Sequence, residues 1–381
     1  MLHRHWSQQG NRARRQAAGL SFPLATRYVR AMRPVTLTSL NDFASLPFDE
    51  VIDARSPAEY AEDHLPGAVN MPSLNDTERA KIGELYVQSS RFLARKLGAS
   101  MVARNVAHHL ETALADKPAD YRPLVYCWRG GQRSNAFATI LGQIGWQVGV
   151  LDGGWKAWRR LVQRALYNDP FPGKIVVLDG NTGTAKTAIL QKVSALGGQV
   201  IDLEGLARHR GSLFGLVPGD VQPSQKRFET CLAQAMITLD MSRPILVEAE
   251  SNRIGALRIP PSLWQAMQAG RRIKIEAPVE ARALWLTQAY GDIIADPAEL
   301  ASRIEALSPF QSHATIEAWK ILAKDGAFQD LAAQLMIAHY DPRYERTAMR
   351  QQRGADTVLT TQALDDKEQG QLAEKIASLL N

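Results

Sequence analysis

The residue with the clearest chemical potential is Cys127, because it stands in a loop rich in arginine and glycine. The residues from Tyr126 to Ser134 read Tyr-Cys-Trp-Arg-Gly-Gly-Gln-Arg-Ser, and the run of residues 124–126 before the cysteine is apolar. A loop between a buried strand and a helix points backbone N–H groups into one concavity and adds the positive end of the helix. Both favour a thiolate and an anionic substrate beside it. The loop therefore predicts a soft nucleophile that attacks or carries sulfur or selenium next to an anion.

The residues after Cys127 are expected to bind that anion. Two arginines supply fixed positive charge, and the two glycines are expected to let the backbone curl with positive φ. Two roles remain open for Trp128, which are stacking on an extruded base and anchoring of the loop in the core. The alternative for Cys127 is a buried structural cysteine, which the surrounding arginines and glycines disfavour. The predicted anion-binding loop comprises Trp128, Arg129, Gly130, Gly131, Gln132 and Arg133.

A second loop, over residues 180–187, is typical of a phosphate-binding loop, apart from Ala185 in place of the glycine before the lysine. Its backbone N–H groups would hold a diphosphate, Lys186 would neutralise it, and Thr187 could bind Mg²⁺. If position 185 requires positive φ, alanine costs about 1 kcal/mol there. The alternative is a helix N-terminus without a ligand. The predicted diphosphate-binding residues are Gly180, Asn181, Thr182, Gly183, Thr184, Ala185, Lys186 and Thr187.

Other polar residues have a less distinctive setting. Glu248 and Glu250 follow an apolar run and could support Mg²⁺ or position a substrate, or they could be solvated acids at the end of a strand. Cys231 has apolar neighbours at helical spacing, which indicates packing rather than chemistry. No spacing of cysteine and histidine suggests a resident metal site, and we predict none.

The elements that position these loops follow from the alternation of apolar and polar segments. Apolar runs alternate with helical patterns twice along the chain, which predicts two parallel sheets covered by helices. Ser56 and Pro57 suit a helix start. The Pro- and Gly-rich residues 168–173 read as a linker. Strands are expected at residues 51–53, 124–126, 148–151, 174–178, 199–203, 245–248 and 272–276, a long helical stretch at 76–114, a helix from about 134, and mainly helices after 279.

The first half of the chain resembles the rhodanese superfamily over roughly residues 35–165. The Cys127 loop matches the active loop of that family, and residues 52–60, 64–70 and 153–155 match its other hallmark stretches. The resemblance implies supporting roles for Asp53 and Arg55. Five residues separate Cys127 from Arg133, a length typical of rhodanese-like phosphatases, so the pocket is expected to accept a tetrahedral anion.

Further blocks join the two halves into one larger resemblance. Together with the Cys127 loop, residues 74–79, 209–215, 222–229 and 247–255 look like the tRNA 2-selenouridine synthase family, in order and in spacing. The resemblance implies an enzyme that replaces the sulfur of wobble 2-thiouridine in tRNA with selenium from selenophosphate. It implies an S-geranyl-2-thiouridine intermediate made from geranyl diphosphate. No tightly bound cofactor is expected, and a role for Mg²⁺ is left open. An enzyme that supplies selenophosphate is an expected partner. The protein is expected to be cytoplasmic and to make no membrane contact.

The larger resemblance also brings candidate contacts to tRNA or substrate. Arg227 and Arg258 belong to the expected basic patch, and each cation in it has an ordinary surface charge as its alternative. His209 has a hydrogen-bonded loop histidine as its alternative. The predicted contact residues are His209, Arg210, Ser212, Gln222, Ser224, Gln225, Lys226 and Arg253.

The overall charge gives little support to nucleic-acid binding by itself. Residues 1–33 carry seven arginines and no lysine or acid, so removing their +7 from the total of +6 leaves −1 for the rest. Three interpretations of this basic arm stay open: a functionless tail upstream of a start at Met32, an arm that contacts RNA, or a targeting segment. No apolar run reaches the ~18 residues that span a membrane.

Three other functions compete with the main interpretation. The first is a rhodanese-type sulfurtransferase fused to an ATP-using P-loop domain. The second is a catalytically idle tRNA-binding module, which the presence of both Cys127 and Lys186 disfavours. The third is a phosphatase, suggested only by the length of the cysteine loop.

The predicted fold class is α/β, with a rhodanese-like parallel-sheet domain followed by a P-loop NTPase-like α/β domain and a helical C-terminal region. The predicted divisions are a basic and potentially disordered arm at 1–33, a rhodanese-like domain at 34–167, a linker at 168–173, a P-loop-like domain at 174–278 and a mainly helical region at 279–381.

Overall fold

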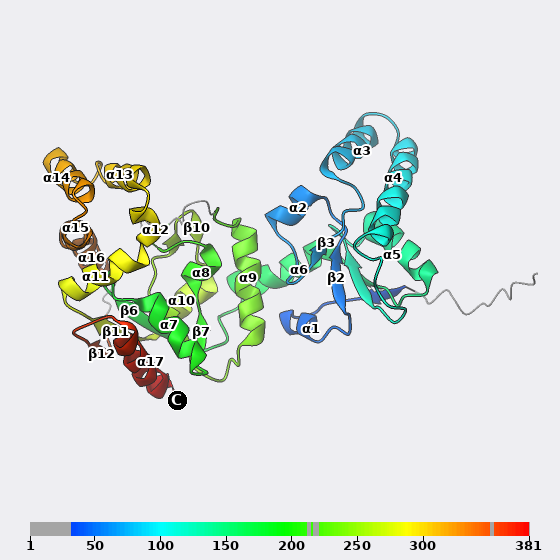
Figure 1. Ribbon diagram of the computed structural model, residues 1–381. Coiled ribbons are helices and arrows are strands. Elements are labelled where there is room, and N and C mark those ends of the chain that lie inside the picture. The colour runs from blue at the N-terminus through cyan, green and yellow to red at the C-terminus, as the bar shows by residue number, and fades with distance from the viewer. Residues whose placement is uncertain (1–31, 212–214, 216–220, 351–353, 381) are drawn as a thin grey trace, which may run out of the picture.

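The computed structural model describes residues 32–211, 215, 221–350 and 354–380. Most of the predicted basic arm, and Ser212 among the predicted contacts, lie outside the described residues. Figure 1 shows two lobes, each built around a sheet, with the Cys127 lobe in blue to blue-green and the P-loop lobe in green to red. Within the described part of the chain, no helix has the length and apolar character needed to cross a membrane.

The first sheet confirms the prediction of a parallel α/β domain. Its strands lie in the order β1-β5-β4-β2-β3, and each neighbouring pair is parallel. The central strand β4 is buried at every position, as expected where helices cover both faces of the sheet. The strands are β1 (Arg33–Val35), β2 (Glu50–Asp53), β3 (Val69–Asn70), β4 (Pro123–Tyr126) and β5 (Gly149–Leu151). The helices are α1 (Leu40–Ala44), α2 (Pro57–Glu62), α3 (Asp76–Gln88), α4 (Arg91–Glu111), α5 (Gln132–Ile144) and α6 (Gly154–Gln163), which continues as a π-helix (Arg164–Asn168).

Two features of this domain differ from the prediction. The long helical stretch expected over residues 76–114 is two helices, because Ser90 caps α4 by accepting a hydrogen bond of 3.3 Å from the backbone N–H of Leu93. Serine competes with the helix interior and favours such a cap. Strand β1 was not predicted, and its first two residues are exposed. The predicted start of α2 is confirmed, with Ser56 at the N-cap and Pro57 in the first turn.

The second sheet is also parallel, in the order β12-β11-β6-β8-β7. Its edge strand β12 comes from the region that was expected to be mainly helical, and it pairs with β11 from Ile273 opposite Thr357. The sheet of the P-loop domain is therefore completed by residues beyond 278. The strands are β6 (Ile175–Gly180), β7 (Gln199–Ile201), β8 (Ile245–Glu248), β11 (Arg271–Glu276) and β12 (Thr357–Thr360), with a separate hairpin of β9 (Arg253–Ile254) and β10 (Leu257–Arg258).

Helices surround this sheet and extend beyond it. Figure 1 shows α11 to α16, in yellow to orange, at the end of the lobe that faces away from the Cys127 domain. The strand predicted at residues 199–203 is shorter than expected, because Asp202 caps the short helix α8 and ends β7 before it. The helices are α7 (Lys186–Ala195), α8 (Leu203–Ala207), α9 (Gln225–Thr238), α10 (Pro261–Ala269), α11 (Val279–Ala289), α12 (Gly291–Ile294), α13 (Pro297–Glu305), α14 (His313–Lys324), α15 (Phe328–Leu335) with a following π-helix (Met336–Tyr340), α16 (Asp341–Arg350) and α17 (Asp366–Leu380).

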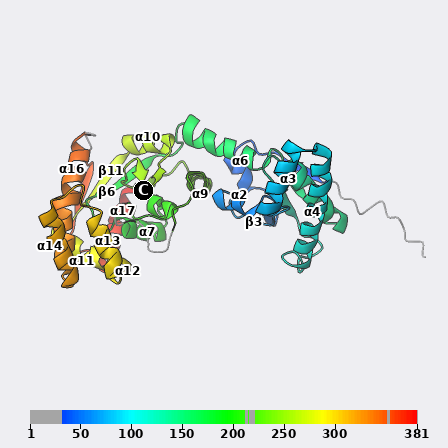
Figure 2. The same cartoon turned by 90° about the horizontal axis from the view of Figure 1, so that it is seen from above.

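The two lobes are joined by more than the predicted linker. Helix α6 lies between them (Figure 2), and it packs against α9 of the second lobe. Trp158 on α6 is fully buried and belongs to one apolar cluster with Phe228 and Leu232 on α9. Buried charges reinforce this contact, because Arg159 pairs with Glu229 at 2.5 Å. The interface is thus continuous with the core of both lobes.

Candidate active sites in two loops

Cys127 lies at the carboxyl end of β4, where the first sheet turns toward α5. Its sulfur lies 3.2 Å from the hydroxyl of Ser134 and accepts a hydrogen bond of 3.3 Å from the backbone N–H of Gly131. The residue is buried. The sequence therefore places the thiol as predicted, between a buried strand and a helix N-terminus.

The pKa of the Cys127 thiol is lowered. Burial by itself raises the pKa, but the hydroxyl of Ser134, the backbone N–H groups of Ser134 and Arg129, and the charge of Arg133 outweigh it. A lower pKa increases the fraction of thiolate near neutral pH, and the thiolate is the nucleophilic form. The loop is thus suited to nucleophilic or sulfur- and selenium-carrying chemistry.

The two loop arginines lie in different surroundings. Arg133 forms an ion pair of 2.7 Å with Glu59 of α2, which holds its guanidinium next to the loop. Arg129 and Gln132 are exposed. An anion from solvent can therefore bind Arg129 directly. The guanidinium of Arg133 instead stays in its ion pair with Glu59, at a fixed position beside the loop.

Glycines let the Cys127 loop pack against the turn before α6. Gly130 has a φ of +67°, and a Cβ there would lie 2.5 Å from a backbone carbonyl oxygen of β5. Gly154 has a φ of +53°, and a Cβ there would lie 2.1 Å from the carbonyl oxygen of Cys127. That same oxygen accepts a hydrogen bond of 2.8 Å from the N–H of Trp155. Gly131 has a φ of −101°, so the expectation of positive φ is wrong for it.

Trp128 is half-buried and anchored. Its ring stacks on that of Trp155 with centroids 4.5 Å apart, and its carbonyl oxygen accepts a hydrogen bond of 3.1 Å from the N–H of Lys156. Of the two roles left open, these contacts favour anchoring of the loop.

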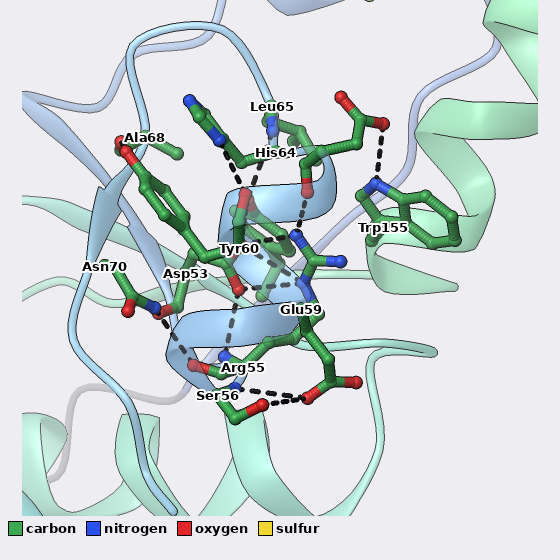
Figure 3. A network of polar contacts seen from close by, with 12 residues as sticks. Asp53, Arg55, Ser56, Glu59, Tyr60, His64, Leu65, Ala68, Asn70 and Trp155 are labelled. Atoms are coloured by element: carbon green, nitrogen blue, oxygen red, sulfur yellow. Dashed lines mark hydrogen bonds and ion pairs between the residues drawn. The ribbon is translucent and has the colours of Figure 1, made fainter. Parts of the chain in front are cut away.

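Asp53 and Arg55 support the Cys127 loop from within the core, where no substrate reaches them. Both are fully buried, and they form an ion pair of 2.6 Å. Arg55 also donates to the carbonyl oxygen of Asp63. Figure 3 shows Asp53 and Arg55 within the surrounding network of polar contacts. Asp53 accepts a hydrogen bond of 2.6 Å from the hydroxyl of Tyr126, which directly precedes Cys127. The pair therefore fixes the end of β4.

Residues 180–187 form a loop between β6 and α7, as predicted. Ala185 has φ 57° and ψ 28°, which is the left-handed conformation. This conformation costs an alanine about 1 kcal/mol, a cost that a glycine at this position would avoid. Gly180 and Gly183 also have positive φ. A Cβ on Gly183 would lie 3.0 Å from the side chain of Leu286, so the loop packs closely against α11.

Lys186 and Thr187 are both held by polar partners at the start of α7. The ammonium of Lys186 donates a hydrogen bond of 2.9 Å to the carbonyl oxygen of Gly180. The hydroxyl of Thr187 donates one of 2.9 Å to Glu204. The lysine therefore lies across the loop that would hold a diphosphate, as a phosphate-binding lysine should.

The predicted acids lie beside this loop with strongly raised pKa values. Burial, with the nearby charges of Asp202 and Glu204, raises the pKa of Glu248 to about 8. Burial, followed by the charge of Glu204, also raises the pKa of Glu250 well above its ordinary value. Glu248 is fully buried, so the interpretation as a solvated acid is wrong for it, whereas Glu250 is half-buried and borders the cavity over this loop. Glu248 instead accepts a hydrogen bond of 2.8 Å from the backbone N–H of Glu204.

A cavity of about 660 Å³ opens over the phosphate loop. Its lining includes Gly180 and residues 182–187 of the loop, together with Glu204 and Glu250. Aromatic and aliphatic side chains, among them Trp285, Leu286, Tyr290 and Tyr340, also line it. The cavity thus offers an anion-binding loop next to an apolar wall.

The predicted contacts His209 and Arg210 belong to the P-loop lobe, and the two residues have different surroundings. His209 is nearly buried, and its Nδ1 accepts a hydrogen bond of 3.1 Å from the N–H of Gly211, which makes it the loop histidine that was the alternative. Arg210 lines the cavity over the P-loop. It forms two hydrogen bonds with Asp292, of 3.0 and 3.1 Å, and lies over the ring of Tyr290.

Ser224, Lys226 and Arg227, from the predicted contacts and basic patch, bond to residues of the Cys127 lobe. Ser224 donates to the carbonyl oxygen of Glu62, and Lys226 pairs with the carboxylate of that residue, both at 2.5 Å. Arg227 donates to the carbonyl oxygen of His64 at 3.0 Å. Lys226 and Arg227, which were expected to belong to an RNA-binding patch, are thus already bonded to Glu62 and His64. The structure does not support the expectation for these two residues.

The remaining predicted contacts divide in the same way. Gln222 donates to the carbonyl oxygen of Ile254 at 3.0 Å, and Gln225 donates to that of Arg258 at 2.9 Å, so both hold the β9–β10 hairpin. Arg253 and Arg258 on that hairpin are exposed. They are the members of the predicted basic patch that stay accessible.

Several residues of the sites were not predicted. Ser134 was assigned only as the start of a helix, although a hydroxyl one turn into that helix can reach back to the cysteine. Arg282 of α11 donates to the carbonyl oxygen of Thr182 at 3.1 Å and pairs with Asp341 at 2.8 Å. Its position about 100 residues beyond the loop left no local signal. No group of three or more His, Cys, Asp or Glu side chains that could hold a metal ion occurs in the described ranges.

The comparisons with known proteins match both halves of the chain. Residues 38–161 match the rhodanese-like domain family, and residues 173–316 match the tRNA 2-selenouridine synthase AAA domain family. A tRNA 2-selenouridine synthase of Nitrosomonas europaea is 36% identical over 279 residues, which cover 71% of this chain and 70% of the relative. One of Chromohalobacter salexigens is 37% identical over 64% of this chain and 66% of the relative. A solved Saccharomyces cerevisiae structure, described as a homologue of single-domain rhodanese, is 15% identical over 34% of this chain and 81% of that one, with a TM-score of 0.22.

Proposed function

Because the chain belongs to the tRNA 2-selenouridine synthase family, we propose that it replaces the sulfur of wobble 2-thiouridine with selenium in two steps, one at each loop. The P-loop lobe carries out geranylation of the sulfur. The Cys127 domain then delivers selenium from selenophosphate. The tRNA with wobble 2-thiouridine is the macromolecular substrate, and an enzyme that makes selenophosphate supplies the second step.

The geranylation step uses the diphosphate as its leaving group. The sulfur of 2-thiouridine attacks carbon 1 of geranyl diphosphate, so that a carbon–sulfur bond forms and the carbon–oxygen bond to diphosphate breaks, while the base loses the proton on nitrogen 3 to solvent. The backbone N–H groups of the loop and the ammonium of Lys186 would stabilise the departing charge. In this role Lys186 exchanges its contact with the carbonyl oxygen of Gly180 for one with the diphosphate.

The selenation step uses the thioether that geranylation creates. Selenium of selenophosphate attacks carbon 2 of the base, and geranyl thiolate leaves in place of a poorer leaving group. Water then breaks the selenium–phosphorus bond and releases phosphate. The N–H groups around Cys127, with exposed Arg129, would bind selenophosphate beside the thiol.

Oxygen ligands for Mg²⁺ are present at the P-loop. The hydroxyl of Thr187 already contacts the carboxylate of Glu204. Mg²⁺ usually takes one or two protein oxygens and several from phosphate and water. Thr187 and Glu204 would therefore hold Mg²⁺ when the diphosphate is bound, and the ion would add positive charge beside the leaving group.

The observation that carries the proposal is the composition of the P-loop cavity. Its lining combines the phosphate loop with the apolar side chains of Trp285, Leu286 and Tyr290. An apolar wall next to a diphosphate cradle favours a prenyl diphosphate. This supports geranyl diphosphate over ATP as the donor.

The proposal is tested by mass spectrometry of the nucleosides in 2-thiouridine tRNA after incubation with the full chain. Geranyl diphosphate alone is expected to give S-geranyl-2-thiouridine, and ATP turnover should stay at the level of a Lys186→Met variant. Rapid ATP hydrolysis that is lost in Lys186→Met, without any geranylated nucleoside, would instead support the sulfurtransferase with an ATP-using domain.

A further inference from the structure

A separate apolar pocket of about 70 Å³ lies among the helices beyond the P-loop. Its walls come from α11, α12, α13 and α15, and include Leu286, Ile293, Leu300, Phe328 and Ala332. Ile293 and Leu300 are almost fully buried. The pocket therefore runs into the core of the helical region rather than over its surface.

This pocket adjoins the cavity over the phosphate loop. Thr182, Leu286, Tyr290 and Tyr340 line both. Thr182 belongs to the phosphate loop itself, and its carbonyl oxygen accepts a hydrogen bond from Arg282 of α11. Helix α11, which carries Leu286, is thus fixed against the loop, and the pocket lies next to the predicted diphosphate-binding residues.

We propose that this pocket binds the distal isoprene unit of the prenyl donor, an inference that rests on the proposed function. A space of this measure holds about five to seven water-sized groups, at 10–15 Å³ each. An isoprene unit has five carbon atoms. The first isoprene unit of geranyl diphosphate would then lie along Leu286 and Tyr290, and the second would fill the pocket.

Phe328 is positioned to set the length of the chain. It lines the apolar pocket, and it also lines a second cavity of about 420 Å³, together with Ile294 and Leu300. These three side chains therefore form the partition between the two spaces. A third isoprene unit would have to pass the partition, so the wild-type chain should prefer geranyl over farnesyl diphosphate.

The first test fills the pocket from α15. Ala332 is half-buried and lines the pocket, whereas Ala338 is exposed and does not. Affinities of the full chain for dimethylallyl diphosphate and geranyl diphosphate are measured by calorimetry at fixed Mg²⁺. The wild type should bind geranyl diphosphate on the order of a hundredfold more tightly, because the distal unit is buried. Ala332→Phe should remove most of that preference and leave dimethylallyl diphosphate unchanged, and Ala338→Phe should alter neither.

The second test opens the pocket. Phe328→Ala should raise the affinity for farnesyl diphosphate about tenfold by joining the two spaces, with no change for dimethylallyl diphosphate. This variant keeps the inference testable if Ala332→Phe fails to fold, which circular dichroism would reveal.

The outcomes separate the inference from the proposed function. If the wild type binds neither prenyl diphosphate, the prenyl donor is wrong and the pocket assignment falls with it. If the wild type prefers geranyl diphosphate but folded Ala332→Phe and Phe328→Ala behave like the wild type, the donor stands and the pocket is only an imperfectly filled helical core. A higher melting temperature of Ala332→Phe with unchanged affinities would show the same.

Discussion

The hydroxyl of Ser134 lies 3.2 Å from the sulfur of Cys127, seven residues earlier in the chain and across the turn into α5. It is the leading contact that lowers the pKa of the thiol against the effect of burial. Ser134→Ala should therefore raise the pKa of Cys127 and shift its alkylation profile to higher pH. The rate of iodoacetamide labelling is measured as a function of pH, with mass spectrometry of the Cys127 peptide to separate it from Cys231.

A matched control is available on the same helix. Thr139 is exposed, and its hydroxyl bonds only to the backbone of its own helix and to a surface methionine. Thr139→Ala should leave the labelling profile in place. A Ser134→Ala profile that coincides with the wild type would show that the loop N–H groups alone set the thiolate population.

Ala185 should be replaceable by glycine with a gain in stability. It is the N-cap of α7 in a left-handed conformation, where glycine carries no steric penalty. Ala185→Gly should raise the free energy of unfolding by about 1 kcal/mol. Urea denaturation would show this as a higher midpoint with an unchanged slope. Ala188→Gly, inside the same helix, should instead lower the free energy of unfolding by about 1 kcal/mol. A loss of stability in both variants would contradict the strain at Ala185.

Glu248 should make the folded protein less stable as the pH rises. Its pKa in the folded state is about 8 against an ordinary value of 4.5, so the folded state holds the proton more tightly than the unfolded state. Stability from this group is fully present below about pH 4.5 and is lost progressively as the pH rises to about 8. Glu248→Gln removes that loss. The free energy of unfolding of the variant should therefore rise relative to that of the wild type between these pH values, and the difference should stay constant above them.

Urea unfolding at several pH values measures this difference. Glutamine keeps an oxygen that can accept the hydrogen bond from the N–H of Glu204, so the comparison isolates ionisation. Glu374→Gln, at an exposed position on α17, serves as the control. A difference between Glu248→Gln and the wild type that does not change with pH would mean that Glu248 is ionised in the folded state across this range.

The pair of Arg159 and Glu229 should fix the contact between the lobes. Both side chains are nearly buried, and the hydroxyl of Tyr167 also bonds to Glu229. Arg159→Met leaves Glu229 buried without its cation, and such a loss typically costs about 3–5 kcal/mol. Hydrogen exchange should increase in α6 and α9 ahead of the rest of the chain. Adding Glu229→Gln should restore much of the protection, and unchanged exchange in the single variant would mean that the apolar cluster alone joins the lobes.

Local sequence was sufficient for the parts of the fold that have strong local signals. The buried strands β4, β6 and β8 each contain a run of at least three apolar residues, and each was predicted to within two residues. Cys127 directly follows the run in β4, and Lys186 follows the run in β6 after a glycine-containing loop, so both loops could be placed. Ser56 and Pro57 likewise identified the start of α2.

Other parts depend on pairing between distant residues, which a single sequence does not display. The edge strands β1 and β12 are short and partly exposed, so their patterns resemble loops. Lys226 has the composition of an RNA-binding residue, yet its partner Glu62 lies 164 positions earlier in the chain. The sequence shows that Lys226 is a cation, whereas its role at the interface between the lobes is visible only in the tertiary structure.

The central claim is that geranylation belongs to the P-loop lobe and selenation to the Cys127 loop. The most direct measurement follows the nucleosides of 2-thiouridine tRNA by mass spectrometry after geranyl diphosphate and selenophosphate are added to Cys127→Ala. We predict that S-geranyl-2-thiouridine accumulates at the wild-type rate and that 2-selenouridine does not form. Loss of the geranylated nucleoside in folded Cys127→Ala, or undiminished formation of 2-selenouridine, would contradict the account.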